Sequence, residues 1–143
     1  MRTFYIFKIN NEYSNLTKEI PYNLYATLLS IKLMEDEDKD YLKAQYDSLT
    51  DELVEVNNII YEKMNNLENY MVRHNLHIYN SYFTDEISRL KVFNSFMILK
   101  TNIPNSTFFT ILIDIPNLFI IDFANQDYFW LSTFQNLRLV NTR

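Results

Sequence analysis

Glycine and cysteine are both absent from this chain of 143 residues. Loops that wrap around a phosphate need glycine, because only a residue without a Cβ lets successive backbone N–H groups approach an anion closely. Neither the P-loop nor the glycine-rich dinucleotide-binding pattern can therefore exist here, which disfavours nucleotide hydrolysis and Rossmann-type binding. Turns must depend instead on asparagine, which tolerates the left-handed conformation better than most residues.

The lack of cysteine excludes disulfides, thiolate metal sites and thiol catalysis together. The N-terminal segment also lacks the cleavage site and the long apolar stretch of a signal peptide. No segment approaches the roughly 20 consecutive apolar residues that a bilayer-spanning helix needs. We therefore expect a soluble cytoplasmic protein with no membrane partner.

Hydrophobic residues make up 48% of the chain and aromatic residues 16%, which disfavours disorder. The length suits one domain with a real core but is too short for two ordinary domains. No internal repeat, linker or low-complexity segment divides the chain. We expect residues 1–143 to form a single domain.

The net charge is −5, and the acidic residues are concentrated in the middle of the chain. Residues 35–70 carry eleven acidic and three basic side chains, whereas residues 71–143 carry five acidic and six basic ones. An acidic surface repels the DNA backbone, whose recognition normally requires clustered Lys and Arg. The pattern favours a protein partner with basic patches and predicts no direct nucleic acid binding.

The first regular segment, residues 2–9, has the alternation of a β-strand. Tyr5 and Phe7 would share one face, and Phe4 and Ile6 would share the other. Burial of both faces is typical of a strand in the interior of a sheet. We expect a central strand.

The C-terminal region predicts a β-hairpin. Residues 118–123 and 128–131 are rich in β-branched and aromatic residues, and a four-residue link separates them. Tyr128 and Trp130 lie two positions apart and so share a face of their strand. We expect Trp130 to be buried in the core.

The longest regular pattern is an apolar stripe with helical spacing. Its members are Leu42, Tyr46, Leu49, Leu53, Val56, Ile60, Met64, Leu67 and Met71. One continuous helix of about thirty residues would reach about 45 Å, which is long for a domain of this size. We expect a break near Asn57 and Asn58, or exposure of one end to a partner. The same stripe could instead form the seam of a homodimeric coiled-coil adaptor.

The remaining elements complete a mixed fold. Residues 85–90 suggest a helical turn or two, residues 92–100 a strand, and Asn105 or Ser106 can cap a short helix that ends near Asp114. Residues 75–81 are ambiguous. The order predicts an α/β or α+β two-layer sandwich, with four or five strands and helices on one or both faces.

Candidate catalytic residues are few. His74 and His77 lie three apart and could share a helix face as metal ligands, but no third ligand has a suitable spacing. Asp122 follows apolar residues at a strand end, where a carboxylate can act as an acid or base. Hydrogen bonding within the hairpin is the favoured role for Asp122. We expect no catalytic residue, cofactor or metal, and we keep an enzyme or metal-binding protein that uses Asp122 and the two histidines as the alternative.

Tyr13 is the most interesting aromatic outside the periodic segments. It lies in the polar stretch of residues 10–17, where no periodicity requires burial. An aromatic in such a place is suited to anchor an interface, because it buries a large area at low entropic cost. The alternative is that its ring folds back over the sheet edge.

Three groups of residues resemble the sporulation inhibitor of replication (SirA) family. The matching residues are Arg2, Phe4, Tyr5 and Phe7, then Glu12, Tyr13 and Asn15, then Gln45 and Tyr46, and finally the pattern D-F-x-x-x-x-Y-x-W-L over residues 122–131. Residues between Asn65 and Asn105 show no match. The glycines of the family and most of its prolines are missing from this chain.

The resemblance implies a bacterial, non-enzymatic regulator that binds the N-terminal domain of the replication initiator DnaA and inhibits replication in the context of sporulation. Carried over by position, the contact residues would be Tyr13, Asn15, Thr17 and Glu52. Thr17 stands where the family tends to place an aromatic residue. Glu52 is aligned through Gln45 and Tyr46.

Overall fold

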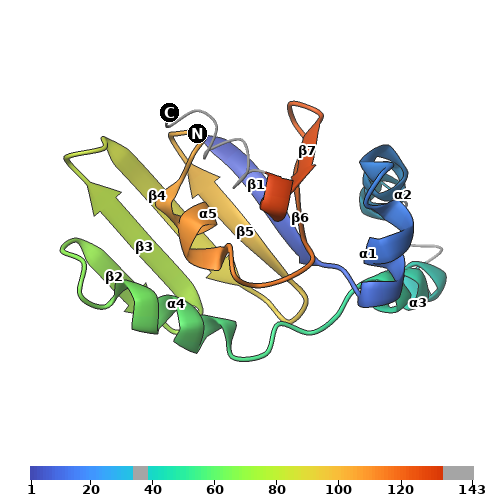
Figure 1. The fold of residues 1–143 in the computed structure, drawn as a ribbon, viewed down its shortest axis with the longest axis horizontal. Coiled ribbons are helices and arrows are strands. Elements are labelled where there is room, and N and C mark those ends of the chain that lie inside the picture. The colour runs from blue at the N-terminus through green and yellow to red at the C-terminus, as the bar shows by residue number, and fades with distance from the viewer. Residues whose placement is uncertain (34–38, 134–143) are drawn as a thin grey trace.

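The computed structural model describes residues 1–33 and 39–133, and it shows seven β-strands in one antiparallel sheet (Figure 1). The strands are β1 (Arg2–Lys8), β2 (Tyr70–Arg73), β3 (Leu76–Ser81), β4 (Glu86–Val92), β5 (Phe96–Thr101), β6 (Leu118–Asp122) and β7 (Asp127–Trp130). The helices are α1 (Asn11–Thr17), α2 (Pro21–Leu33), α3 (Lys39–Leu49), α4 (Val56–Met64) and α5 (Thr107–Leu112). The spatial order of the strands is β2-β3-β4-β5-β1-β6-β7.

The first strand lies inside the sheet, as its alternation predicted. β1 pairs with β5 on one side and with β6 on the other. Phe4 and Ile6 are buried on one face, and Phe7 is buried on the opposite face. The prediction of a central strand is confirmed.

Each face of the sheet has its own hydrophobic core. On one face, Val56, Ile60 and Met64 of α4 pack with Phe108 and Phe109 of α5 against the strands. On the other face, α2 contributes Leu24, Tyr25 and Leu28, and α3 contributes Leu49. This second core lies mainly over β1, β6 and β7. These strands contribute Phe7, Phe119, Ile121 and Trp130 to it.

The predicted sheet of four or five strands was wrong, because the described part of the chain forms seven. Of residues 85–90, which suggested a helical turn, Asp85 lies in a turn and residues 86–90 belong to β4. Alternate residues of β4 are buried, but Glu86 and Ser88 point inward while Ile87 is 47% exposed. In this strand polar side chains face the core and an apolar one faces water. The order of apolar and polar residues in the sequence therefore does not show the two-residue repeat of a β-strand.

The expected break in the long helical stripe is present, but it does not lie at Asn57 and Asn58. α3 ends at Leu49 and α4 begins at Val56, so the interruption lies at residues 50–55 and Asn57 lies within α4. The end of β1 holds this segment: Asn10 N–H donates to the Leu49 carbonyl, and Asp51 N–H donates to the Lys8 carbonyl, both at 2.9 Å. Backbone bonding to a neighbouring strand replaces the helical bonds that these residues would otherwise make.

The apolar stripe is therefore divided between the two faces of the sheet. Leu49 belongs to the core under α2 and α3, whereas Val56, Ile60 and Met64 belong to the core under α4 and α5. Met71 lies in β2 rather than in a helix. A dimer seam of the kind the stripe suggested has no continuous helix to lie on within the described residues. Leu42 falls among the side chains that the structure does not describe.

The C-terminal hairpin and the cap of α5 are confirmed. β6 and β7 pair in antiparallel register, with Phe119 opposite Trp130. Trp130 is 5% exposed, and its ring makes an edge contact with Phe119 at 4.9 Å between centroids. Ser106 caps α5 by accepting a hydrogen bond from Phe108 N–H. Helix α5 ends at Leu112, two residues before the predicted end at Asp114.

Turns without glycine use several residue types in the left-handed conformation. Positive φ values occur in the described chain at Glu55, Asn69, His74, Asp85, Asn117 and Gln126. Asparagine supplies two of these six positions, so the expectation that turns rest on asparagine holds only in part. Asx side chains tolerate this region best, and the other residue types adopt it at a cost of roughly 1 kcal/mol or more each.

Candidate protein-binding surface

Helix α1 begins where the chain leaves the central strand. Asn10 is its N-cap, and the Asn10 Oδ1 atom accepts a 2.8 Å hydrogen bond from Tyr13 N–H. The Asn10 side-chain amide also donates to the Ser48 carbonyl at the end of α3. The first bond satisfies a free N–H group at the start of α1, and the second satisfies a free carbonyl near the end of α3. Together they fix α1 against α3.

The inner side of α1 is polar and fully engaged. Ser14 is 1% exposed, and its hydroxyl donates to Asn117 Oδ1 at 2.8 Å in the loop before β6. Thr17 is 9% exposed, and its hydroxyl donates to the Tyr13 carbonyl at 2.6 Å. Thr17 therefore offers a partner little surface, and its visible contact supports the helix itself.

The outer side of α1 carries exposed apolar side chains. Tyr13 is 37% exposed, and Leu16, one helical turn further on, is 73% exposed. Ile20, in the turn after the helix, is 56% exposed. Asn15 is exposed as well. We call Tyr13, Leu16 and Ile20 the α1 patch. Tyr13, which comes from a polar stretch without periodicity, lies in a short helix with its ring partly open to solvent.

Glu52 lies in the segment that links the two faces of the sheet. It is exposed, and it lines a shallow pocket of about 200 Å³ together with Lys8, Leu53 and Val54. Leu53 N–H donates to the Asn94 carbonyl at 2.7 Å, so this segment is held at both ends. Burial lowers the pKa of Lys8, although the nearby Asp51 opposes that effect. Glu52 and α1 both adjoin the Lys8 end of β1.

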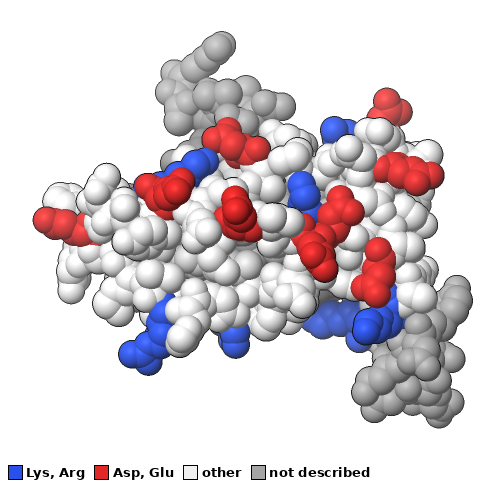
Figure 2. All heavy atoms as spheres, turned by 90° about the horizontal axis from the view of Figure 1, so that it is seen from below, with Lys and Arg blue, Asp and Glu red and all other residues white. Residues whose placement is uncertain are grey.

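Acidic side chains surround this region. Figure 2 shows Asp and Glu spread over the face that is seen from below, where α4 and the segment before it lie. The described acidic side chains between Asp47 and Glu68 are thus exposed rather than part of a buried network. Such a surface suits a partner with basic groups.

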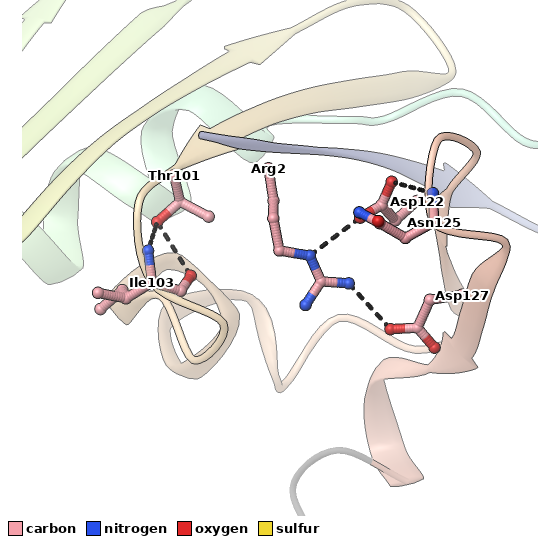
Figure 3. Close-up of polar contacts among 6 residues, drawn as sticks. All are labelled: Arg2, Thr101, Ile103, Asp122, Asn125 and Asp127. Atoms are coloured by element: carbon pink, nitrogen blue, oxygen red, sulfur yellow. Dashed lines mark hydrogen bonds and ion pairs between the residues drawn. The ribbon is translucent and has the colours of Figure 1, made fainter.

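Asp122 has the structural role that was favoured for it (Figure 3). It is 1% exposed, and it accepts hydrogen bonds from Arg2 Nε at 2.9 Å, Asn125 Nδ2 at 2.7 Å and Asn125 N–H at 3.2 Å. Burial would raise the pKa of Asp122, but the hydrogen bonds from Asn125 and Arg2 outweigh burial and lower it. The group stays a carboxylate and fastens the β6–β7 turn to β1.

The two histidines do not lie together as a metal pair. His74 is exposed in the turn between β2 and β3, with φ of 56°, while His77 is fully buried in β3. Both ring nitrogens of His77 are engaged, by the Tyr70 hydroxyl at 2.7 Å and by Asn57 Oδ1 at 2.8 Å. Within residues 1–33 and 39–133, no group of three or more His, Cys, Asp or Glu is placed to hold a metal ion.

A buried polar cluster around Glu86 was not predicted from the sequence. The Glu86 carboxylate accepts hydrogen bonds from the Ser106 hydroxyl at 2.7 Å, from the Thr107 hydroxyl at 2.7 Å and from Thr107 N–H at 3.0 Å. These donors lie at the start of α5, so the carboxylate attaches this helix to β4. Glu86 follows Asp85 in a stretch that mixes polar and apolar residues, so nothing near it in the sequence indicated that it would be buried.

No protein-family model matches this chain, and no curated protein sequence matches it. The resemblance to the SirA family therefore depends on the short motifs at the two ends and in the middle. Among the described residues, no helix combines the length and the apolar character that crossing a membrane requires.

Proposed function

We propose that this protein binds the N-terminal domain of the replication initiator DnaA and thereby restrains the initiation of chromosome replication. The proposal starts from the motif resemblance. The observation that supports it best is the exposed aromatic ring of Tyr13 on a helix whose inner side is tied down by hydrogen bonds.

A fixed helix is a good platform for binding. The bonds of Asn10 and Ser14 hold α1 against α3 and against the loop before β6, so little ordering of the backbone is needed when a partner docks. Tyr13 and Leu16 would bury apolar area, and the tyrosine hydroxyl would keep a polar contact. Interfaces in which a few such anchors dominate can be tight even at modest area.

The charge near α1 favours a basic partner surface. Glu52 is exposed near the same end of β1, and its sequence neighbours Asp51 and Glu55 are exposed as well. A basic partner surface would be attracted to this region, and rim charges of this kind act mainly on the association rate. Tyr13 and Leu16 would supply affinity, while Asn15 and Glu52 would supply polar contacts at the edge.

Calorimetric titration of the purified protein with the DnaA N-terminal domain tests the proposal. Tyr13→Ala should weaken binding by about 2 kcal/mol, or about thirtyfold, because it removes a central aromatic anchor. The melting temperature should change little, since the ring is partly exposed.

Tyr82→Ala is the matched control. Tyr82 is 93% exposed at the turn between β3 and β4, at the opposite end of the sheet from α1 (Figure 1). It should bind the DnaA domain as the parent does. Absence of heat at tens of micromolar for the parent would refute the proposed function. Equal losses in the two variants would refute the α1 patch as the site.

A further inference from the structure

One half of the sheet is covered on only one side by the described helices. Leu90 of β4 and Leu99 of β5 are buried under α4 and α5, so the residues between them along each strand point to the opposite side. On that opposite side, the described helices α2 and α3 pack over β1, β6 and β7. We call the outward side of β2 to β5 the open face.

The open face is basic and contains no acidic residue. Arg73, Arg89, Lys91 and Lys100 all lie on it, and none of these strands places an Asp or Glu there. Arg89 and Lys100 are direct cross-strand partners. None of the four forms an ion pair with a described residue. In Figure 2, Lys and Arg are seen at the lower left margin, and no Asp or Glu lies beside them there.

Like charges opposite each other destabilise a sheet, so the pair of Arg89 and Lys100 costs stability, and neither side chain has a described ion-pair partner that would offset this cost. The protein has a net charge of −5, yet the open face carries four basic residues and no acidic one. A bound anionic partner would turn the same repulsion into attraction.

Aliphatic side chains alternate with the cations. Ile78 lies opposite Arg89, and Ile98 lies opposite Lys91. Ile87 and Met71 on the same side are 47% and 61% exposed. A partner that covers this face must therefore bring both acidic and apolar groups.

The open face leads into an apolar pocket at the border with α2. The pocket has a volume of about 210 Å³, and its walls include Tyr5 and Phe96 from the sheet and Ile31 from α2. Lys32 stands beside it, with its Nζ atom 4.6 Å from the ring centre of Tyr5 and 4.2 Å from that of Phe123. The pocket can receive one apolar side chain, with a cation at its rim for a neighbouring carboxylate.

We propose that the open face binds an acidic amphipathic segment of a protein partner, with one apolar side chain of that segment in the pocket. The charge complementarity and the aliphatic residues between the cations favour this occupant. A nucleic acid would find isoleucines in place of stacking aromatic rings in the middle of the face, and the net negative charge of the protein would oppose its approach. This surface is separate from the α1 patch and does not depend on DnaA binding.

Fluorescence anisotropy with defined probes tests the inference. The first probe is a labelled peptide of about 18 residues, or five helical turns, with leucines at helical spacing and glutamates elsewhere. The second has lysine in place of glutamate, and the third is a single-stranded oligonucleotide of about 12 nucleotides. The acidic peptide should bind at low salt and weaken as salt rises, while the other two probes should not bind.

Three charge-neutralising variants locate the site. Arg89→Gln and Lys100→Gln should each reduce affinity for the acidic peptide by about tenfold. Lys63→Gln, on α4 at the opposite side of the sheet, removes the same charge and should leave the affinity unchanged. Since each open-face variant relieves a like-charge pair, it should melt no lower than the parent, which separates lost binding from lost folding.

The inference is overturned if the acidic peptide does not bind at about 1 mM protein, if the lysine peptide binds as well, or if Lys63→Gln loses as much affinity as Arg89→Gln. Tighter binding of the oligonucleotide than of the peptide would assign the face to nucleic acid and overturn it as well. Amide chemical-shift changes that map to β2–β5 and to the residues around the pocket on peptide addition would support it directly.

Discussion

Arg2 and Asp122 lie 120 residues apart in the chain and form an ion pair in which Arg2 Nε is 2.9 Å from Asp122 Oδ2. The same guanidinium reaches Asp127 Oδ2 at 3.0 Å with Nη2 (Figure 3). One residue at the start of β1 thus holds both ends of the β6–β7 turn. The motif residues at the two ends of the sequence meet at this point in the fold.

Asp122→Ala should destabilise the protein by about 1–3 kcal/mol, because it removes a buried acceptor of several hydrogen bonds. Asp127→Ala is the control, since Asp127 is half exposed and an exposed ion pair contributes less than about 1 kcal/mol. Urea unfolding measures both. Equal effects would show that burial of Asp122 does not determine the strength of the contact.

The regions with regular patterns were predictable from the sequence. β1 and the first strand of the C-terminal hairpin are runs of β-branched and aromatic residues, which favour strands. Ser106 is a good N-cap before an apolar helix. In each case local pattern and tertiary burial agree, so the pattern alone was sufficient.

The missed regions are those where tertiary contacts overrule the local pattern. In β4 the buried side carries Glu86 and Ser88, whose polarity is satisfied by donors from α5 far along the chain. At Leu49 the helical stripe continues in sequence, but the backbone bonds to β1 instead. Neither partner could be identified from residues near the affected segment.

The α1 patch and the open face also differ in how far the sequence indicated them. Tyr13 was recognisable because a single aromatic in a polar stretch is a local signal. The open face was not, because its cations come from β2, β4 and β5, and only the strand order brings them together. Like-charged partners such as Arg89 and Lys100 are visible only once the register is known.

His77 should make stability fall as the solution becomes acidic. Burial lowers the pKa of His77 from 6.5 to about 4, so between these pH values the unfolded chain binds more protons than the folded one. The contribution of the neutral ring is fully present above pH 6.5 and is lost as pH falls toward 4. The loss is on the order of 3 kcal/mol, from about 2.5 pKa units at 1.36 kcal/mol each.

Urea unfolding between pH 7 and pH 4 measures this slope. His77→Gln should lower stability at pH 7 and flatten the dependence, because the titrating group is gone. His74→Asn should keep the slope of the parent, since His74 is exposed in a turn. A parent slope that persists in His77→Gln would assign the acid sensitivity to carboxylates instead.

Trp130 provides a test of core packing that separates ring volume from hydrogen bonding. The ring is 5% exposed and packs against Phe119, yet its Nε1 atom is buried and has no hydrogen-bond partner among the described residues. Trp130→Ala should cost about 3–5 kcal/mol, because it leaves a large cavity between the hairpin and α2. Trp130→Phe should cost far less, since it keeps an aromatic ring and also removes an unsatisfied polar group.

Because Trp130 is the only tryptophan, its fluorescence reports on the site in the native protein. Emission should be blue-shifted and poorly quenched by iodide, and it should shift to the red in a single transition with the loss of the fold. If Trp130→Phe is as damaging as Trp130→Ala, the indole nitrogen must have a partner in solution. Efficient quenching of the folded protein would instead place the ring at the surface and make the β7 side of the molecule a third candidate for binding.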